Sequence, residues 1–187
     1  MIPFLKNGIY ILFEKGEPGH STDRIVRIGT HTGQDRLRLR LFEHFLREKK
    51  DRSIFRKNIG RALLNKDNDP FLEKWNLDLT TRKAREQHSG SVDFDKQEEV
   101  EKRVTEYIQE KFSFVVFQVD DKTGRLNFES KIISTVSLCK ECKQSGDWLG
   151  NFSPKAKIRK SGLWQEKELW ETPLNEEEMI GLQQLLN

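Results

Sequence analysis

Two short runs of strand-forming residues near the start of the chain constrain its fold most strongly. Residues 8–13 and 24–29 are rich in the β-branched and aromatic side chains that suit a pleated surface. Between them, residues 15–21 contain glycine and proline, which break regular structure and permit a reversal. We therefore expect an antiparallel hairpin with a long loop, in which Tyr10 and Arg27 share one end of the sheet.

A third run, residues 112–119, gives the strongest strand signal in the chain and should form the central or third strand. The spacing of apolar residues predicts helices from residue 36 onward and over residues 53–65, 95–111, 126–138 and 175–186. The pattern predicts an α/β (α+β) fold with a small, mainly antiparallel, three-stranded central sheet flanked by helices.

The helix that follows the hairpin is predicted to have two different faces. Asp35 can cap a helix that begins at Arg36. At about 100° per residue, Arg40 and His44 fall on its polar face, opposite a face of leucine and phenylalanine. Because Arg40 and His44 lie one turn apart, they can present a guanidinium and an imidazole to a single phosphate group.

These residues together resemble the GIY-YIG nuclease superfamily. Gly8-Ile9-Tyr10 matches the first signature, and Arg27-Ile28-Gly29 stands where the second is expected. Arg40 and His44 reproduce the family's Arg-x-x-x-His helix, and Glu129 resembles its metal-binding glutamate at the start of a helix. Three further stretches look like those of one branch of small family members: residues 53–56, 148–150 and 161–164. The resemblance therefore covers most of the chain.

The resemblance implies a metal-dependent endonuclease that hydrolyses phosphodiester bonds of DNA. Glu129 would hold one Mg²⁺ (or Mn²⁺), an oxygen ligand being suited to a hard cation. Arg40 and Arg27 would neutralise the scissile phosphate, and Tyr10 with His44 would handle the proton of the attacking water. A free tyrosine is protonated at neutral pH, so Tyr10 would need the nearby arginine charges to act as a base. Whether Tyr10 or His44 is the base stays open.

Two departures from the family pattern affect the site. Arg27 stands where the family commonly has tyrosine; it cannot act as a phenol, but its permanent charge can bind a phosphate oxygen. Many members also carry an asparagine after the glutamate, and the nearest candidate, Asn151, lies farther along the chain than expected.

Composition says less about the function than the order of these motifs does. The chain has 187 residues, of which 34% are charged and 35% hydrophobic, with a formal net charge of +3. A charge this mild does not by itself indicate a nucleic-acid partner. Lysine and arginine are concentrated over residues 36–61 and 155–160, however, and two such stretches could flank a phosphate backbone. We therefore expect substrate contacts from Arg36, Arg56, Asn151 and Lys155.

Length and patterning predict a single domain over residues 1–187. Within it we expect a polar insertion at about 66–92 and a loop-rich C-terminal extension at about 143–187. No apolar run is long enough to cross a bilayer and the first residues lack a secretory pattern, so we expect a cytoplasmic protein with no membrane partner. A homodimer is allowed but not required, and RNA stays open as a substrate beside DNA.

The only two cysteines, Cys139 and Cys142, form one Cys-x-x-Cys motif, which is half of a zinc site or a redox pair. Other ligands would have to come from distant histidines: His20, His31 or His88. The sequence therefore favours reduced, structural thiols over zinc.

Two other functional classes compete with the nuclease. One is a DNA-binding module of the same fold that has lost cleavage, which the departure at Arg27 keeps open. The other is an interaction or metal-responsive protein built around the cysteine pair. It ranks a distant third.

Overall fold

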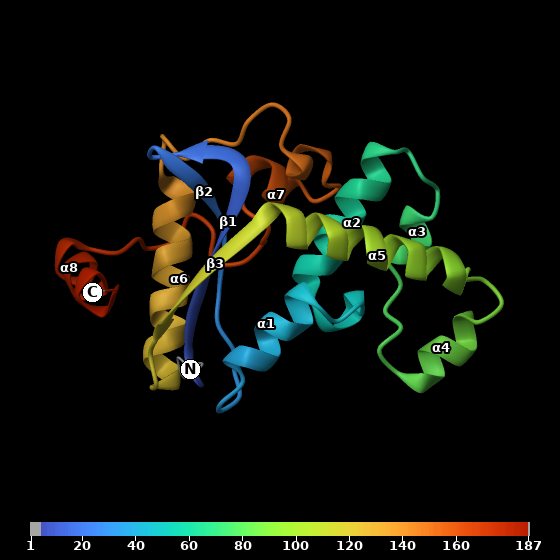
Figure 1. Cartoon of the computed structure of the whole chain (residues 1–187), viewed down its shortest axis with the longest axis horizontal. Coiled ribbons are helices and arrows are strands. Elements are labelled where there is room, and N and C mark those ends of the chain that lie inside the picture. The colour runs from blue at the N-terminus through green and yellow to red at the C-terminus, as the bar shows by residue number, and fades with distance from the viewer. Residues whose placement is uncertain (1–4, 187) are drawn as a thin grey trace.

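The computed structural model describes residues 5–186 and has a three-stranded antiparallel sheet flanked by helices, as the sequence predicts (Figure 1). The strands are β1 (Gly8–Gly19), β2 (Thr22–Gly29) and β3 (Phe112–Gln118). Their order in the sheet is β2-β1-β3, so β1 is central and both neighbours run antiparallel to it.

The hairpin differs from the expected one. β1 continues to Gly19, and only His20 and Ser21 form the turn to β2, with φ angles of 49° and 65°. The glycine and proline between the two runs lie at an irregularity of the pairing rather than in a long loop, since Pro18 still pairs with Asp23. A bulge of this kind can absorb extra residues without ending a strand.

The helices between β2 and β3 are α1 (Leu37–Phe45), α2 (Ile54–Lys66), α3 (Leu72–Trp75), α4 (Arg82–His88) and α5 (Phe94–Lys111). After β3 come α6 (Lys122–Leu138), α7 (Ala156–Ser161) and α8 (Glu176–Leu186). Short 3₁₀ turns lie at Lys50–Arg52 and Leu149–Phe152. Figure 1 shows α6 beside the sheet and α1, α2 and α5 away from α6.

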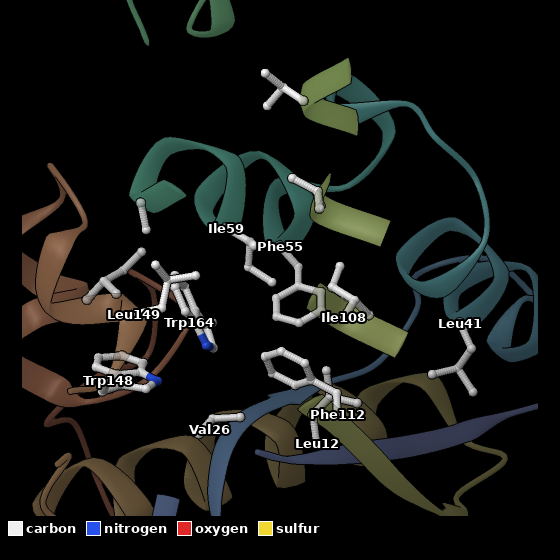
Figure 2. Packing of buried hydrophobic residues seen from close by; sticks show 14 of the residues in the cluster. Leu12, Val26, Leu41, Phe55, Ile59, Ile108, Phe112, Trp148, Leu149 and Trp164 are labelled. Carbon is white, nitrogen blue, oxygen red and sulfur yellow. The ribbon is translucent and has the colours of Figure 1, made fainter. Parts of the chain in front are cut away.

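Alternation along β1 builds a core on each face of the sheet, because successive side chains of a strand point to opposite faces. Tyr10 and Leu12 belong to a cluster that also includes residues of α1, α2 and α5. Ile9 and Ile11 belong to a second cluster, with residues of α6. Figure 2 shows the first cluster, in which Leu12 and Val26 of the sheet lie near side chains of α2 and β3 and the indoles of two tryptophans.

Helix α2 is buried on nearly every side, and its basic residues are buried with it. Arg56, Lys57 and Arg61 are all buried. Arg56 Nη2 lies 2.9 Å from Glu101 Oε2 on α5, and Lys57 Nζ lies 2.9 Å from an oxygen of Asp51. The helix is enclosed because α5, α3 and the C-terminal segment all pack against it, so the charges are paired internally instead.

The expected insertion at 66–92 contains α3 and α4. Trp75 of α3 is fully buried against Gly60 of α2, where a β-carbon would overlap the indole ring. Its Nε1 donates to the carbonyl oxygen of Lys57 at 3.0 Å. The first half of the insertion therefore belongs to the core, whereas α4 has no buried residues.

The C-terminal extension also belongs to the fold. Trp148 and Trp164 are fully buried, and each indole Nε1 donates to Glu14 Oε2 at 2.9 Å. The backbone N–H of Trp164 donates to the carbonyl oxygen of Val26 at 2.7 Å. Because β2 is an edge strand, this contact satisfies a backbone group that the sheet leaves unpaired. Within residues 5–186, no helix combines the length and apolar character that crossing a membrane requires.

Candidate functional site

In both signature motifs, other atoms lie so close to one glycine that no side chain would fit there. At Gly8, a β-carbon would overlap the carbonyl oxygen of Phe117 on β3. At Gly29, which pairs with Tyr10 across the sheet, a β-carbon would overlap the phenol oxygen of Tyr10. Glycine is therefore needed at both positions for space, and Gly29 sets where the Tyr10 ring lies.

Tyr10 and His44 form a buried hydrogen-bonded pair. Tyr10 Oη lies 2.8 Å from His44 Nε2, and both residues are at most 1% exposed. His44 Nδ1 lies 2.7 Å from the hydroxyl of Ser53, which caps the N-terminus of α2 by accepting from the backbone N–H of Arg56. The sheet, α1 and α2 are thus joined through one chain of polar groups.

His44 is neutral in this environment. Its complete burial holds the pKa of His44 well below the ordinary value, since burial disfavours the charged form. Three arginine charges add to the effect: those of Arg40, Arg27 and Arg56. A neutral imidazole has one donor and one acceptor nitrogen, so it can accept the proton of the Tyr10 phenol or donate to its oxygen.

Glu129 lies in the interior of α6, which corrects the expectation that it opens a helix. The helix begins at Lys122 and is capped by Asp121, so Glu129 is more than one turn inside. Its Oε1 accepts a hydrogen bond from the backbone N–H of Thr30 at 3.0 Å. The helix dipole therefore contributes little here, and the strand end after β2 holds the carboxylate instead.

The surroundings of Glu129 favour the protonated form of its carboxyl group more than bulk water would. Burial raises the pKa of Glu129, and the nearby carboxylate of Glu168 raises it further. The hydrogen bond from Thr30 and the charges of Arg27 and Arg40 act in the opposite direction. This half-buried carboxylate therefore lies within the electrostatic reach of two of the predicted phosphate-binding arginines.

Glu129 lines a cleft of about 270 Å³. Arg27 of β2 and Asn58 of α2 form part of its wall, and the C-terminal extension adds Gln165 and Glu168. Arg27 is 7% exposed, and its Nη1 donates to the carbonyl oxygen of Trp164 at 2.6 Å. Its Nε is buried and has no hydrogen-bond partner among residues 5–186. The Arg27 side chain thus brings a positive charge to the cleft wall, which suits an anionic ligand.

Arg40 and Arg36 line a second cleft, of about 470 Å³. Thr30 also lines it, so the hydrogen bond between Thr30 and Glu129 joins the walls of the two clefts. Arg40 Nη1 donates to the carbonyl oxygen of Arg52 at 3.1 Å and lies 3.5 Å from a carboxylate oxygen of Glu43. These contacts hold the guanidinium near the cleft, where its charge acts on both Glu129 and His44.

The start of α1 also differs from the expectation. The helix begins at Leu37 with Arg36 at its cap position, and no side chain of residues 5–186 caps it. Asp35, with a φ of 57°, instead accepts a hydrogen bond from the side chain of Asn7 at 3.0 Å. Arg36 is left exposed in the wall of the second cleft.

Three of the expected substrate contacts lie outside both clefts. Arg56 is 0% exposed and bound to Glu101, so it is a structural residue and the expectation of a substrate contact is corrected. Asn151 donates from its side chain to the carbonyl oxygens of Ser145 and Gly146, which ties down a turn of the extension. Lys155 is half-buried, and its Nζ lies 3.7 Å from a carboxylate oxygen of Glu166.

The sequence did not point to Gln165 and Glu168. Gln165 Oε1 accepts from the backbone N–H of Ile28 at 3.0 Å, and Glu168 Oε2 accepts from the hydroxyl of Ser130 at 2.6 Å. Glu168 has a φ of 59°, which is uncommon for a residue other than glycine and occurs often at functional sites. The one available signal was their position immediately after the family-like stretch at residues 161–164.

The residues of the first cleft fit a divalent cation. Mg²⁺ is usually held by one or two carboxylates, with water and substrate phosphate oxygens completing its shell. Glu129 supplies one carboxylate, and its only hydrogen bond from residues 5–186 is made at Oε1, which leaves Oε2 for a ligand. Glu168 supplies a second carboxylate in the same cleft wall.

Comparison with known proteins agrees with this geometry. A family model described as "GIY-YIG domain" matches residues 2–185, nearly the whole chain. Searches of curated proteins and of solved structures find no significant match.

Proposed function

The chain belongs to the GIY-YIG domain family, and from this premise we propose that it is a metal-dependent endonuclease that hydrolyses phosphodiester bonds of DNA. GIY-YIG domains are typically nucleases that use divalent metal ions, so an enzyme acting on nucleic acid is the general conclusion. The choice of DNA, the residue roles and the single-domain organisation are our proposal. The observation that carries it is the half-buried Glu129 carboxylate in a cleft beside the buried, partly unpaired guanidinium of Arg27.

Glu129 is proposed to bind one Mg²⁺ or Mn²⁺ through its Oε2. When bound, the cation would supply charge stabilisation at the phosphate and a more acidic water. Glu168 is the candidate for a second carboxylate ligand, since it lines the same cleft and its charge acts on Glu129.

Arg27 and Arg40 are proposed to bind the non-bridging oxygens of the scissile phosphate. Their guanidiniums are held by the carbonyl oxygens of Trp164 and Arg52 respectively, so little side-chain freedom is lost when a phosphate binds. Arg27 would thus stabilise the negative charge of the phosphate, although it lacks the phenol of the tyrosine that usually stands at this position. Arg36, exposed in the second cleft, would contact an adjacent phosphate.

Tyr10 and His44 are proposed to handle the proton of the attacking water. The phenol would take this proton as its own passes to His44 Nε2, 2.8 Å away. Ser53 would support the relay at the other ring nitrogen. Because both side chains are buried here, the proposal requires that water reach Tyr10 Oη when substrate is bound.

The test is incubation of supercoiled plasmid with purified protein and Mg²⁺ or Mn²⁺, followed by separation of nicked and linear forms. Single-stranded DNA and RNA of matched sequence run in parallel and define the substrate class. We expect cutting of DNA that EDTA abolishes, and linear product without a nicked intermediate would indicate two sites acting together, as in a homodimer.

A binding module without cleavage is the second candidate. The burial of Tyr10 and His44 against each other favours it, because a pair sealed in the core can serve structure alone. Tight binding of DNA without any cutting, by wild-type protein and by Glu129→Ala alike, would establish this alternative in place of the endonuclease.

A further inference from the structure

A second constellation of ligand-type residues lies at the tip of the β1–β2 hairpin. His20, Cys139 and Cys142 each offer one atom, and these three atoms all lie within 4.8 Å of one another. His20 Nε2 is 3.3 Å from Cys139 Sγ, although the two residues are 119 positions apart in sequence. Both cysteines are free thiols and are half-buried. The turn thus supplies the histidine that the Cys-x-x-Cys motif lacks in the local sequence.

His20 is oriented by an acidic neighbour. Its Nδ1 lies 3.4 Å from Glu141 Oε2, while Nε2 faces the thiol of Cys139. Histidine ligands of metal ions commonly donate their other ring N–H to a carboxylate, which fixes the tautomer and leaves a lone pair for the metal. Glu141 stands in this supporting position.

The turn holds His20 in an uncommon backbone conformation. His20 and Ser21 form a two-residue turn with φ angles of 49° and 65°, a region where residues other than glycine are uncommon. A two-residue turn of this kind is usually made by Asn-Gly or Gly-Gly. Histidine adopts this region more readily than most other residues, so the turn accommodates His20 and places it at the hairpin tip.

We propose that His20, Cys139 and Cys142 bind one Zn²⁺, with a water molecule as the fourth ligand. In a tetrahedral site with Zn–S of about 2.3 Å and Zn–N of about 2.0–2.1 Å, nitrogen and sulfur ligands lie about 3.6 Å apart. The observed 3.3 Å between His20 Nε2 and Cys139 Sγ requires a widening of only a few tenths of an ångström. Two thiolates and an imidazole favour zinc over the hard cation of the nuclease cleft.

The position on α6 favours a cation over a redox pair. Cys139 is the residue at which α6 ends, where the helix dipole is negative. Many reactive cysteine pairs are instead activated at helix N-termini, the opposite end of a helix. A divalent cation at this end would be stabilised by the dipole and would neutralise two thiolates.

The site is separate from the proposed nuclease chemistry. Cys139 is ten residues beyond Glu129, about 15 Å along the helix at 1.5 Å per residue. Bound zinc would tie the hairpin tip to the end of α6, the helix that carries Glu129. Loss of the zinc ion should lower the stability of the fold without removing any side chain from the cleft that contains Glu129.

The experiment uses tag-free full-length protein, so that no added histidines bind metal. Protein is loaded with Zn²⁺, desalted, and analysed for metal content per chain. Variants Cys139→Ser with Cys142→Ser, and His20→Ala, are compared with His88→Ala, which removes a histidine on α4 outside the cluster. Loading with Co²⁺ in place of zinc adds an optical readout, since thiolate ligands give cobalt a near-ultraviolet charge-transfer band.

We expect about one zinc ion per chain in the wild type and in His88→Ala, because one cluster supplies the ligands. The double cysteine variant should hold none, and its cobalt band should be lost. His20→Ala should bind at least about tenfold more weakly, the loss that removal of even a supporting residue produces. Absence of zinc and of the cobalt band from folded wild-type protein, or a Cys139–Cys142 disulfide in their place, would overturn the proposal.

Discussion

At the scale of single residues, the site is built by a few close fits rather than by a concentration of charge. Gly29 makes room for the Tyr10 phenol, and the phenol reaches His44. Glu129 is fixed by the N–H of Thr30, at the end of the strand that carries Arg27. Sequence motifs pointed to these side chains, but the motifs could not reveal which of them are buried.

Replacement of Tyr10 by phenylalanine tests the proton-handling role. In Tyr10→Phe the aromatic ring would still lie against Gly29, but the hydroxyl bonded to His44 would be lost. We expect the rate of DNA cutting to fall by about a hundredfold or more, the contribution typical of a proton-transferring group, with a small change in DNA affinity. The measurement is single-turnover cleavage together with a binding titration. Cutting at the wild-type rate would remove Tyr10 from the chemistry.

The depressed pKa of His44 predicts a pH dependence of stability. In the unfolded chain a histidine takes up a proton below a pH of about 6.5, whereas folded His44 resists protonation. The unfolded state then binds more protons, so the contribution of His44 to stability is present above about pH 6.5 and is lost as the pH falls below it.

Urea unfolding of wild type and His44→Gln over a series of pH values measures this effect. The difference in free energy of unfolding between the two proteins should shrink by up to about 1.4 kcal/mol per pH unit below pH 6.5. Taking the difference removes the opposite contribution of carboxylates such as Glu14, whose pKa burial raises. A difference that is constant across the series would show that His44 titrates normally in the folded protein.

At the scale of elements, the positions of strands and helices could be predicted because apolar periodicity is a local property of the sequence. The surroundings of each element could not be predicted in this way. The periodicity of residues 53–65 identified α2, yet it could not show that α3, α5 and the extension enclose the helix and bury Arg56. The turn at His20 was hidden because glycine and proline inside β1 resembled a loop. The expected start of α6 was late because the polar residues before Leu126 carry no apolar signal.

The hairpin gives a test at this scale. In Gly29→Ala, the new methyl group would displace the Tyr10 ring and separate it from His44. We expect a loss of about 1–3 kcal/mol in stability, as for other overpacked sites, and a fall in cutting rate like that of Tyr10→Phe. Thermal unfolding and the cleavage assay measure both. Gly90→Ala is the matched control, since nothing lies within 4 Å of a β-carbon there, and an equal effect of both variants would contradict the account.

At the scale of the whole molecule, the C-terminal extension completes the sheet edge and the cleft. It pairs with β2 through Trp164, and it supplies Gln165 and Glu168 to the wall that faces Glu129. Sequence patterning marked this region only as loop-rich, because its order depends on contacts with Glu14 and Val26 more than 130 positions away. The cleft is therefore a property of the assembled chain and not of the signature motifs alone.

Trp164→Ala tests the place of the extension in the fold. The change removes a fully buried indole and one of the donors to the buried Glu14 carboxylate. We expect a loss of about 3–5 kcal/mol in the free energy of unfolding, measured with urea. Trp170→Ala, at a half-buried indole of the same segment, should cost clearly less. Equal costs would mean that the extension does not pack as described.

The most direct test of the central claim is the dependence of DNA cutting on metal concentration in wild type and Glu129→Gln. Glutamine keeps an acceptor for the N–H of Thr30, so the fold should be retained and can be checked by thermal unfolding. If Glu129 holds the cation, the variant should cut at least about a hundredfold more slowly, a loss on the scale of one group that stabilises the transition state, and it should need more Mg²⁺ or Mn²⁺. Cutting by Glu129→Gln at the wild-type rate and metal dependence would contradict the account.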